Sequence, residues 1–327
     1  MTDSTILPGL HVIPLPTPFA VGDVNAYLAE GNPLTLIDCG VGTEKTYQAL
    51  TAGLAALGYK IADIRRLVIT HHHTDHLGLA QRVVEESGAE VWCHPITRLW
   101  LERPGEVRQS FRKFSGQFFR EAGVPQPVVE TMHSVEAYLQ SLTGTVQVSC
   151  TLSEGDWLEL SGCRWQVYHT PGHSADLICL YQPDTRVLLS SDHLIKNISS
   201  NPLIEAPERP GEARPRPLLD YLREMARIAE LDILIAYPGH GEAITEIPVL
   251  VESRLSFHQK RADKLLVMFE GQPRTLYELS QIMFPMVQDG EKFLTLSEVL
   301  GHVDILAHDG RLTHEQRGDV VYWKPIN

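Results

Sequence analysis

The stretch Thr-His-His-His-Thr-Asp-His at residues 70–76 carries four metal-ligand side chains within six residues. His71, His73, Asp75 and His76 follow the spacing His-x-His-x-Asp-His. Four such side chains cannot all bind one ion, but on an extended turn alternate residues project in different directions. His71 and His73 can then face one ion while Asp75 and His76 face another. The pattern predicts two neighbouring metal sites.

A run of this kind can also be a surface patch of histidines, or a helix start at which Thr74 or Asp75 acts only as an N-cap. The flanking sequence favours the metal sites. Residues 67–69 (Leu-Val-Ile) predict a buried strand, and residues 77–86 predict a helix. Junctions between a strand and a helix are where α/β proteins place their chemistry.

Three further ligand candidates each follow a short apolar run. His173 ends the segment His-Thr-Pro-Gly-His, Asp192 ends the strand-like run 187–192, and His240 lies in the segment Tyr-Pro-Gly-His-Gly. A single Pro-Gly-His segment is a weak signal, because Pro-Gly occurs in turns of every kind. The joint pattern is much stronger. It predicts that His71, His73 and His173 hold one ion, that Asp75, His76 and His240 hold the second, and that the Asp192 carboxylate bridges both.

These motifs resemble those of the metallo-β-lactamase-fold hydrolase superfamily, and the pattern is nearest its glyoxalase-II-like branch. The resemblance rests on Asp38-Cys39-Gly40, the run 70–76, His173, Asp192 and His240, which spread over roughly the first 245 residues. It implies an α/β fold, the αββα sandwich of two mixed sheets with outer helices and metals at one edge. It also implies that Asp38 accepts a hydrogen bond from a metal-bound histidine.

The periodicity of apolar residues agrees with a layered α/β domain. Predicted strands cover residues 10–14, 25–29, 34–38, 67–70, 90–93, 146–151, 165–169, 177–181, 187–190 and 233–236. Predicted helices cover residues 43–57, 77–86, 107–122, 128–142 and 218–229.

Three other histidines are expected to pack in the core or to support the ligands by hydrogen bonds, rather than to bind metal themselves. His72 would project opposite to its neighbours, and His169 and His193 lie in or just after strands. His193 is also a candidate for lining the substrate site, since it follows Asp192.

The chain of 327 residues is longer than one sandwich domain requires. We expect a catalytic domain at residues 1–248 and a second, small domain at residues 249–327. The second segment predicts three helices and a short hairpin, with Thr275 and Glu278 forming a capping box. That order resembles the winged-helix-type extension of some hydrolases of this superfamily. Such an extension serves either substrate binding or packing and dimer formation.

Residues 103–120 mix basic and aromatic side chains on one predicted helix. Aromatic residues at this spacing usually belong to a core, but a helix that covers the entrance for an anionic or acyl substrate is an equal alternative.

Composition and the N-terminal sequence indicate the cellular compartment and the kinds of partner to expect. The five cysteines form no Cys-x-x-Cys pair, the N-terminus lacks the features of a signal peptide, and no apolar run is long enough to span a membrane. We therefore expect a cytoplasmic protein with free thiols and no membrane partner. The formal net charge of −13 disfavours a general nucleic-acid-binding surface.

The ligand types leave the metal open. Zinc is the default for a histidine-rich set with a bridging carboxylate, but imidazole and carboxylate also suit iron and manganese. Two divalent ions would supply a bridging hydroxide that attacks the substrate. Asp75 is the predicted catalytic residue as well as a ligand, because it lies beside that hydroxide and can transfer its proton.

Three functions are consistent with these features. The first is hydrolysis of a thioester, ester or lactone, with a small-molecule acyl substrate. The second is a phosphodiesterase or endoribonuclease acting on nucleic acid, which the C-terminal segment suggests. The third is a non-catalytic metal-binding protein. Hydroxyacylglutathione is disfavoured as the substrate, because the tail lacks the basic helical segment of that enzyme. A homodimer is suggested only by the habit of the family.

Overall fold

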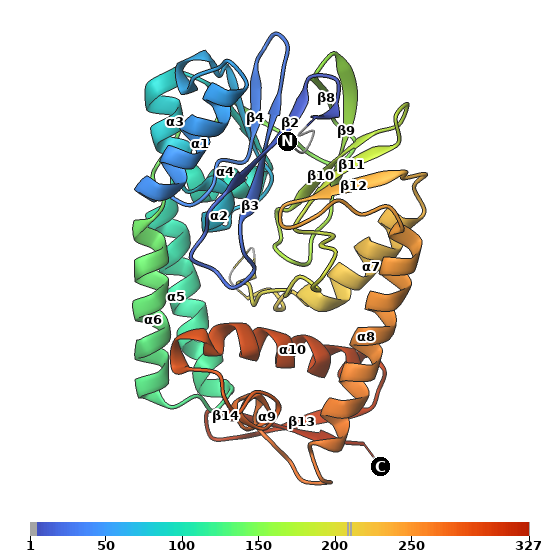
Figure 1. Ribbon diagram of the computed structural model, residues 1–327. Coiled ribbons are helices and arrows are strands. Elements are labelled where there is room, and N and C mark those ends of the chain that lie inside the picture. The colour runs from blue at the N-terminus through green and yellow to red at the C-terminus, as the bar shows by residue number, and fades with distance from the viewer. Residues whose placement is uncertain (1–4, 208, 210, 327) are drawn as a thin grey trace.

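The computed structural model describes residues 5–207, 209 and 211–326. Its core is a pair of mixed β-sheets packed face to face, with helices on both outer faces (Figure 1). This is the αββα sandwich that the sequence predicted.

Among the described residues, seven strands form the first sheet in the order β1 to β7. Neighbours from β1 to β4 run antiparallel, whereas β4 to β7 run parallel. The strands are β1 (Thr5–Leu7), β2 (Leu10–Leu15), β3 (Val24–Ala29), β4 (Thr35–Ile37), β5 (Arg66–Ile69), β6 (Glu90–Cys93) and β7 (Cys150–Thr151).

The second sheet has the order β12-β11-β10-β9-β8, and only the β11–β12 pair is parallel. Its strands are β8 (Trp157–Leu160), β9 (Cys163–His169), β10 (Ile178–Gln182), β11 (Val187–Ser191) and β12 (Ile235–Pro238). Between the two sheets lies an apolar layer in which Tyr27, Val68, Trp165 and Leu180 are buried. Both β10 and β11 are buried along their whole length, which agrees with the apolar runs at residues 178–181 and 187–189.

Helices cover the first sheet on its outer face. α1 begins after Thr43, whose hydroxyl caps the helix by accepting a hydrogen bond from Thr46 N–H. The helices of this part of the chain are α1 (Glu44–Ala56), the short 3-10 turn η1 (Ile61–Asp63), α2 (Thr74–Leu77), α3 (Ala80–Ser87), α4 (Pro95–Glu102), α5 (Pro104–Glu121) and α6 (Gln126–Ser141).

The outer face of the second sheet belongs to one apolar cluster with α7 and the C-terminal helices. These elements are α7 (Pro217–Ala229), α8 (Ile247–Val267), α9 (Leu276–Met283), the 3-10 turn η2 (Asp289–Glu291) and α10 (Lys292–His308), followed by the hairpin β13 (Leu312–Arg317) and β14 (Val320–Pro325). The capping box of Thr275 and Glu278 is present at the start of α9.

The C-terminal segment does not have a core of its own. Leu296 and Val303 of α10 belong to the same apolar cluster as Phe118 of α5 and Met225 of α7. In Figure 1, α10 crosses between the α5–α6 pair and α8. The predicted domain boundary at residue 249 falls within α8, near its start. The order helix, helix, helix, hairpin agrees with the predicted one, while assignment to the winged-helix class stays a prediction.

Two predicted elements were wrong in detail. The helix expected over residues 77–86 is interrupted between α2 and α3. There the backbone of Gly78 approaches Gly42 so closely that a Cβ atom would lie 2.3 Å from Gly42 N. The strand expected over residues 146–151 is reduced to β7, because Val146 N–H donates to the Leu101 carbonyl and Val148 N–H to the Glu102 carboxylate.

Other differences concern short elements. The strands β1 and β8 and the helix α4 were not predicted from the sequence, and β12 begins and ends two residues later than predicted. On the predicted basic and aromatic helix, now α5, Phe118 and Phe119 are buried in the core and Arg112 pairs with Glu136.

Among the described residues, no helix combines the length and apolar character that a membrane crossing requires.

Candidate metal centre

Strand ends bring the predicted ligands to one edge of the sandwich. The run 70–76 follows β5, His173 follows β9, Asp192 follows β11 and His240 follows β12. The two sheets are joined at this edge, since the hydroxyls of Thr70 and Ser191 lie 2.8 Å apart. The loop after β12 is held against β3 by hydrogen bonds from Asn25 and Tyr27 to the carbonyl of Pro238. All seven predicted ligands therefore lie within one small region.

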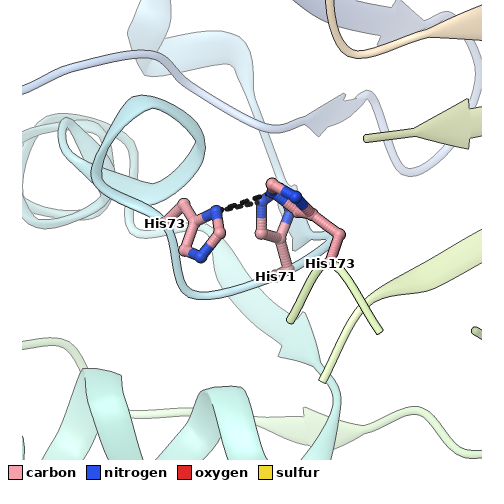
Figure 2. A group of neighbouring side chains, drawn as sticks. All are labelled: His71, His73 and His173. Carbon is pink, nitrogen blue, oxygen red and sulfur yellow. Dashed lines mark hydrogen bonds between the residues drawn. The ribbon is translucent and has the colours of Figure 1, made fainter. Parts of the chain in front are cut away.

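His71, His73 and His173 form the first group. Nδ1 of His73 lies 3.1 Å from Nε2 of His71 and 2.9 Å from Nε2 of His173. Figure 2 shows the three rings with these nitrogens turned toward one another. Four ligands placed tetrahedrally at about 2.0–2.1 Å from one zinc ion lie about 3.3 Å apart. The spacing of the three nitrogens is close to that value.

Asp75, His76 and His240 form the second group, whose donor atoms also lie close enough to share an ion. Oδ2 of Asp75 is 3.2 Å from Nε2 of His240. His76 and His240 are almost completely buried, so their side chains lie at the base of the site rather than on the surface.

Asp192 lies between the two groups. Its Oδ2 atom is 3.5 Å from Nε2 of His173 and 3.6 Å from Nε2 of His240, and its Oδ1 atom is 3.4 Å from Nε2 of His76. A single oxygen, Oδ2, thus faces both groups. A bridging role for Asp192 fits this position.

Hydrogen bonds on the far side of each ring fix which nitrogen carries the proton. Nδ1 of His173 donates to the Asn201 carbonyl at 3.1 Å, and Nδ1 of His240 donates to the Asp23 carbonyl at 2.9 Å. Nδ1 of His76 donates to Asp38 at 2.8 Å, as predicted for that carboxylate. Carbonyl and carboxylate oxygens only accept, so the Nε2 atoms of these rings keep their lone pairs for the centre of the site.

The donor set fits metal ions. In the neutral rings, the lone pairs of Nε2 in His76 and His240 point at the oxygens of a carboxylate, which also carry lone pairs. Neither His76 Nε2 nor Asp192 Oδ1 has a hydrogen-bond partner in the part of the chain that the structure describes. Such an arrangement requires positive charge between the atoms, and imidazole with carboxylate is a set that divalent ions bind.

The pKa shifts differ between the two ligand groups. Burial, followed by the neighbouring rings, lowers the pKa of His71 and His73 well below the ordinary value, which keeps both neutral. Burial would also lower the pKa of His76, but Asp192 and Asp38 raise it above the ordinary value. Burial would raise the pKa of Asp192, but His76 and His240 lower it. Without metal, protons on His76 and His240 supply positive charge beside the carboxylates.

Gly239 lets the backbone pass beside this cluster. A Cβ atom at Gly239 would lie 2.2 Å from Oδ1 of Asp192 and 2.9 Å from Cε1 of His76. The glycine in the segment 237–241 is therefore required by the space that Asp192 and His76 occupy.

The three histidines that were not expected to bind metal do not face the site. Nδ1 of His72 is 2.9 Å from Asp176, and its ring stacks on Trp100. Nε2 of His169 donates to the Ala175 carbonyl at 2.7 Å. His193 is fully buried with its ring against Tyr221, so it does not line an open substrate site.

Some residues that orient the ligands were missed by the sequence analysis. Asp23 and Asn201 act through backbone carbonyls, which any residue type supplies and which leave no sequence signal. Thr70 gives its hydroxyl proton to Asp38 and lies 3.2 Å from Nδ1 of His71, whose proton its oxygen accepts. A threonine directly before the first ligand was the one signal that could have revealed such a contact.

Fold and site together define a metal-dependent hydrolase, and the chain belongs to the metallo-beta-lactamase superfamily. Residues 20–240 match the sequence profile of that superfamily. Over 96% of this chain and 97% of its own length, the "Probable metallo-hydrolase YqjP" of Bacillus subtilis (strain 168) is 38% identical. A crystal structure of a metallo-beta-lactamase family protein from Thermus thermophilus covers 98% of this chain and 100% of its own, with a TM-score of 0.84 and 29% identity.

A more distant relative carries a named activity. The "Atrochrysone carboxyl ACP thioesterase" of Emericella nidulans is 20% identical over 53% of each chain.

Proposed function

We propose that this protein hydrolyses the carbonyl group of a thioester, ester or lactone, using two divalent metal ions that we take to be zinc. The observation that carries the proposal is the position of Asp192 Oδ2, which is about equally distant from Nε2 of His173 and Nε2 of His240, one in each ligand group. When bound, two such ions supply a nucleophile from water near neutral pH and polarise the scissile carbonyl. Neither a serine nor a cysteine nucleophile is needed.

We propose that Asp75 acts as the general base. In the metal-free protein, burial would raise the pKa of Asp75, but the hydrogen bond from the protonated His240 ring and the charge of protonated His76 lower it. The residue is therefore a carboxylate at neutral pH and can take a proton from the attacking water and return it to the leaving group. Oδ2 of Asp75 lies 3.2 Å from Nε2 of His240, whose ring is held in place by the Asp23 carbonyl.

Charge pairing favours an acyl substrate over nucleic acid. In the C-terminal segment, Arg261, Arg274, Arg311, Arg317 and Lys324 each lie within ion-pair distance of an acidic side chain. A nucleic-acid-binding surface would instead leave such cations free to neutralise phosphates. The distant thioesterase relative supports the same choice.

The test is turnover of the metal-loaded protein on a matched panel of one thioester, one lactone, one aryl phosphodiester and one short single-stranded RNA. The Asp192→Ala variant and chelator-treated wild type serve as blanks. We expect cleavage of an acyl compound by the loaded wild type only. Preference for the phosphodiester or the RNA would overturn the proposal in favour of a nuclease, and full metal loading without turnover on any compound would favour a metal-binding protein.

A further inference from the structure

Residues 195–205, which we call the linking segment, touch two of the ligand-bearing elements. The hydroxyl of Ser200 donates to the backbone carbonyl of Asp192. The carbonyl of Asn201 accepts the Nδ1 proton of His173. The position of this segment therefore affects ligands that come from two different strands.

C-terminal helices hold the opposite side of the linking segment. From α8, the Arg254 guanidinium donates to the Lys196 carbonyl at 2.9 Å. From α10, the Ser297 hydroxyl accepts from Ile204 N–H at 3.1 Å, and the Leu294 carbonyl accepts from the Asn201 side chain at 2.9 Å. The C-terminal segment thus contacts the metal centre indirectly, through the linking segment.

A buried pair of histidines makes the central contact. Nε2 of His258, on α8, is 2.8 Å from the Ser199 hydroxyl, and Nδ1 of His258 is 3.2 Å from Nε2 of His302, on α10. Nδ1 of His302 donates to the Glu298 carbonyl at 2.7 Å. Both rings are at most 1% exposed.

The carbonyl at the end of this chain fixes the direction of every hydrogen bond in it. Because the Glu298 carbonyl only accepts, His302 carries its proton on Nδ1 and accepts at Nε2. His258 must then donate from Nδ1, and its Nε2 atom accepts the proton of Ser199. All four groups have a hydrogen-bond partner when both rings are neutral. Burial lowers the pKa of both histidines, and the neighbouring His302 and Arg261 lower that of His258 further.

The same residues do not favour a further metal ion. Glu298 could in principle complete a ligand set with the two histidines. However, its Oε1 atom is 3.1 Å from the Arg261 guanidinium, which already supplies a positive charge. A divalent ion at this place would be repelled by that arginine.

We propose that His258 and His302 are positioning residues for the metal centre: they hold Ser199, and with it the linking segment, in the place that orients Asp192 and His173. This inference rests on the two-metal site of the proposed function. It gives the C-terminal segment a role at the metal centre that requires no contact with substrate.

Two substitutions at His258 each keep one of the two hydrogen bonds of its ring and remove the other. Asn places an amide N–H near the position of Nδ1, which keeps the bond to His302 and loses the bond to Ser199. Gln places an amide oxygen near the position of Nε2, which keeps the acceptor for Ser199. Ser199→Ala removes the same contact from the other side. Ser280→Ala is the matched control, because Ser280 forms a buried 2.8 Å hydrogen bond to Thr295 within the same region but not to the linking segment.

The measurement is cobalt(II) affinity, by competition with a chelator, together with the visible spectrum of the cobalt protein; no substrate is involved. We expect His258→Asn and Ser199→Ala each to weaken binding about tenfold and to change the spectrum. The double variant should lose no more than either single one, because both remove one contact. His258→Gln, which keeps the acceptor for Ser199 and loses the contact to His302, should bind cobalt more tightly than His258→Asn and less tightly than the wild type.

Three results would overturn the proposal. One is unchanged affinity and spectrum in His258→Asn and Ser199→Ala, and another is an equal loss in Ser280→Ala. The third is a third equivalent of cobalt in the wild type that is missing in His258→Asn, since the pair would then be a metal site itself. Because the readout is metal binding, failure here is separable from failure of the proposed acyl hydrolysis.

Discussion

Nδ1 of His76 lies 2.8 Å from Oδ2 of Asp38. The same carboxylate accepts the backbone N–H and the hydroxyl of Thr70, each at 2.8 Å. Asp38 therefore joins the end of β4 to the start of the ligand run and holds the ring of His76 in one orientation. Its backbone is in the left-handed region, with φ of 58°, where Asn is tolerated much better than Ala.

Replacing Asp38 with Asn should weaken metal binding without unfolding the protein. Asn tolerates the backbone conformation but offers one oxygen where Asp38 accepts three hydrogen bonds, so either His76 or Thr70 loses its acceptor. We expect a loss of about 10–100-fold in affinity for the metal held by Asp75, His76 and His240. Titration of zinc against a competing chelator measures this. Unchanged affinity would contradict a role for Asp38 in holding His76.

Removing Asp192 should weaken the binding of two metal ions, whereas removing His240 should weaken the binding of one. Since Oδ2 of Asp192 faces both ligand groups, Asp192→Ala should lower the occupancy of both sites. His240→Ala removes one ligand of the second group and should leave about one ion per chain. Metal content after equilibrium dialysis, measured by mass spectrometry, separates these outcomes. Asp232→Ala is the control, because that carboxylate is exposed and pairs with Arg186. Two tightly held ions in Asp192→Ala would refute the bridge.

Gly239→Ala should disturb the metal centre because the added methyl group has no space. Its Cβ atom would overlap Oδ1 of Asp192, so the carboxylate or the loop must move. We expect weaker metal binding and at least ~10-fold lower turnover, in line with the effect of small displacements of catalytic groups. Gly105→Ala, where a Cβ meets nothing within 4 Å, is the matched control. Normal metal affinity in Gly239→Ala would show that the loop has more room than the structure indicates.

His94 should make the protein less stable in mild acid. Nδ1 of His94 accepts the Ile96 N–H at the start of α4, and burial, together with the nearby His169, lowers the pKa of His94 to about 4. The ordinary value near 6.5 applies to the unfolded chain. The unfolded state therefore binds more protons between pH 6.5 and pH 4, and stability falls as the pH falls through that window, by at most about 1.4 kcal/mol per pH unit.

His94→Asn tests this dependence, since Asn is a good N-cap that does not titrate. Urea unfolding of the metal-free proteins at pH 7.5 and pH 5 should show similar stability at the higher pH and a smaller loss in the variant at the lower one. Other buried histidines, such as His193, are present in both proteins and cancel in the comparison. Equal losses in both proteins would exclude His94 as a source of acid sensitivity.

The fold class could be predicted from sequence because ligand spacing and strand pattern point to the same architecture. Val68 lies in an apolar run just before the first ligand candidates, and Asp192 follows the run 187–191, which begins with three apolar residues, so both candidates lie at strand ends. Boundaries were predicted less well. The break after α2 depends on the approach of Gly78 to Gly42 from a different part of the chain, which local periodicity does not contain.

What the sequence determined by itself is the set of ligand types and the strand ends that carry them, since side-chain chemistry and apolar periodicity are local properties. Only the tertiary structure decided how these side chains are oriented. The single Asp192 oxygen that faces both groups, the carbonyls of Asp23 and Asn201 that fix two imidazole rings, and the His258–His302 pair behind the linking segment all depend on contacts between distant parts of the chain. Such contacts are made by backbone groups and packing, which are specified by how the two sheets and the C-terminal helices come together rather than by any local motif.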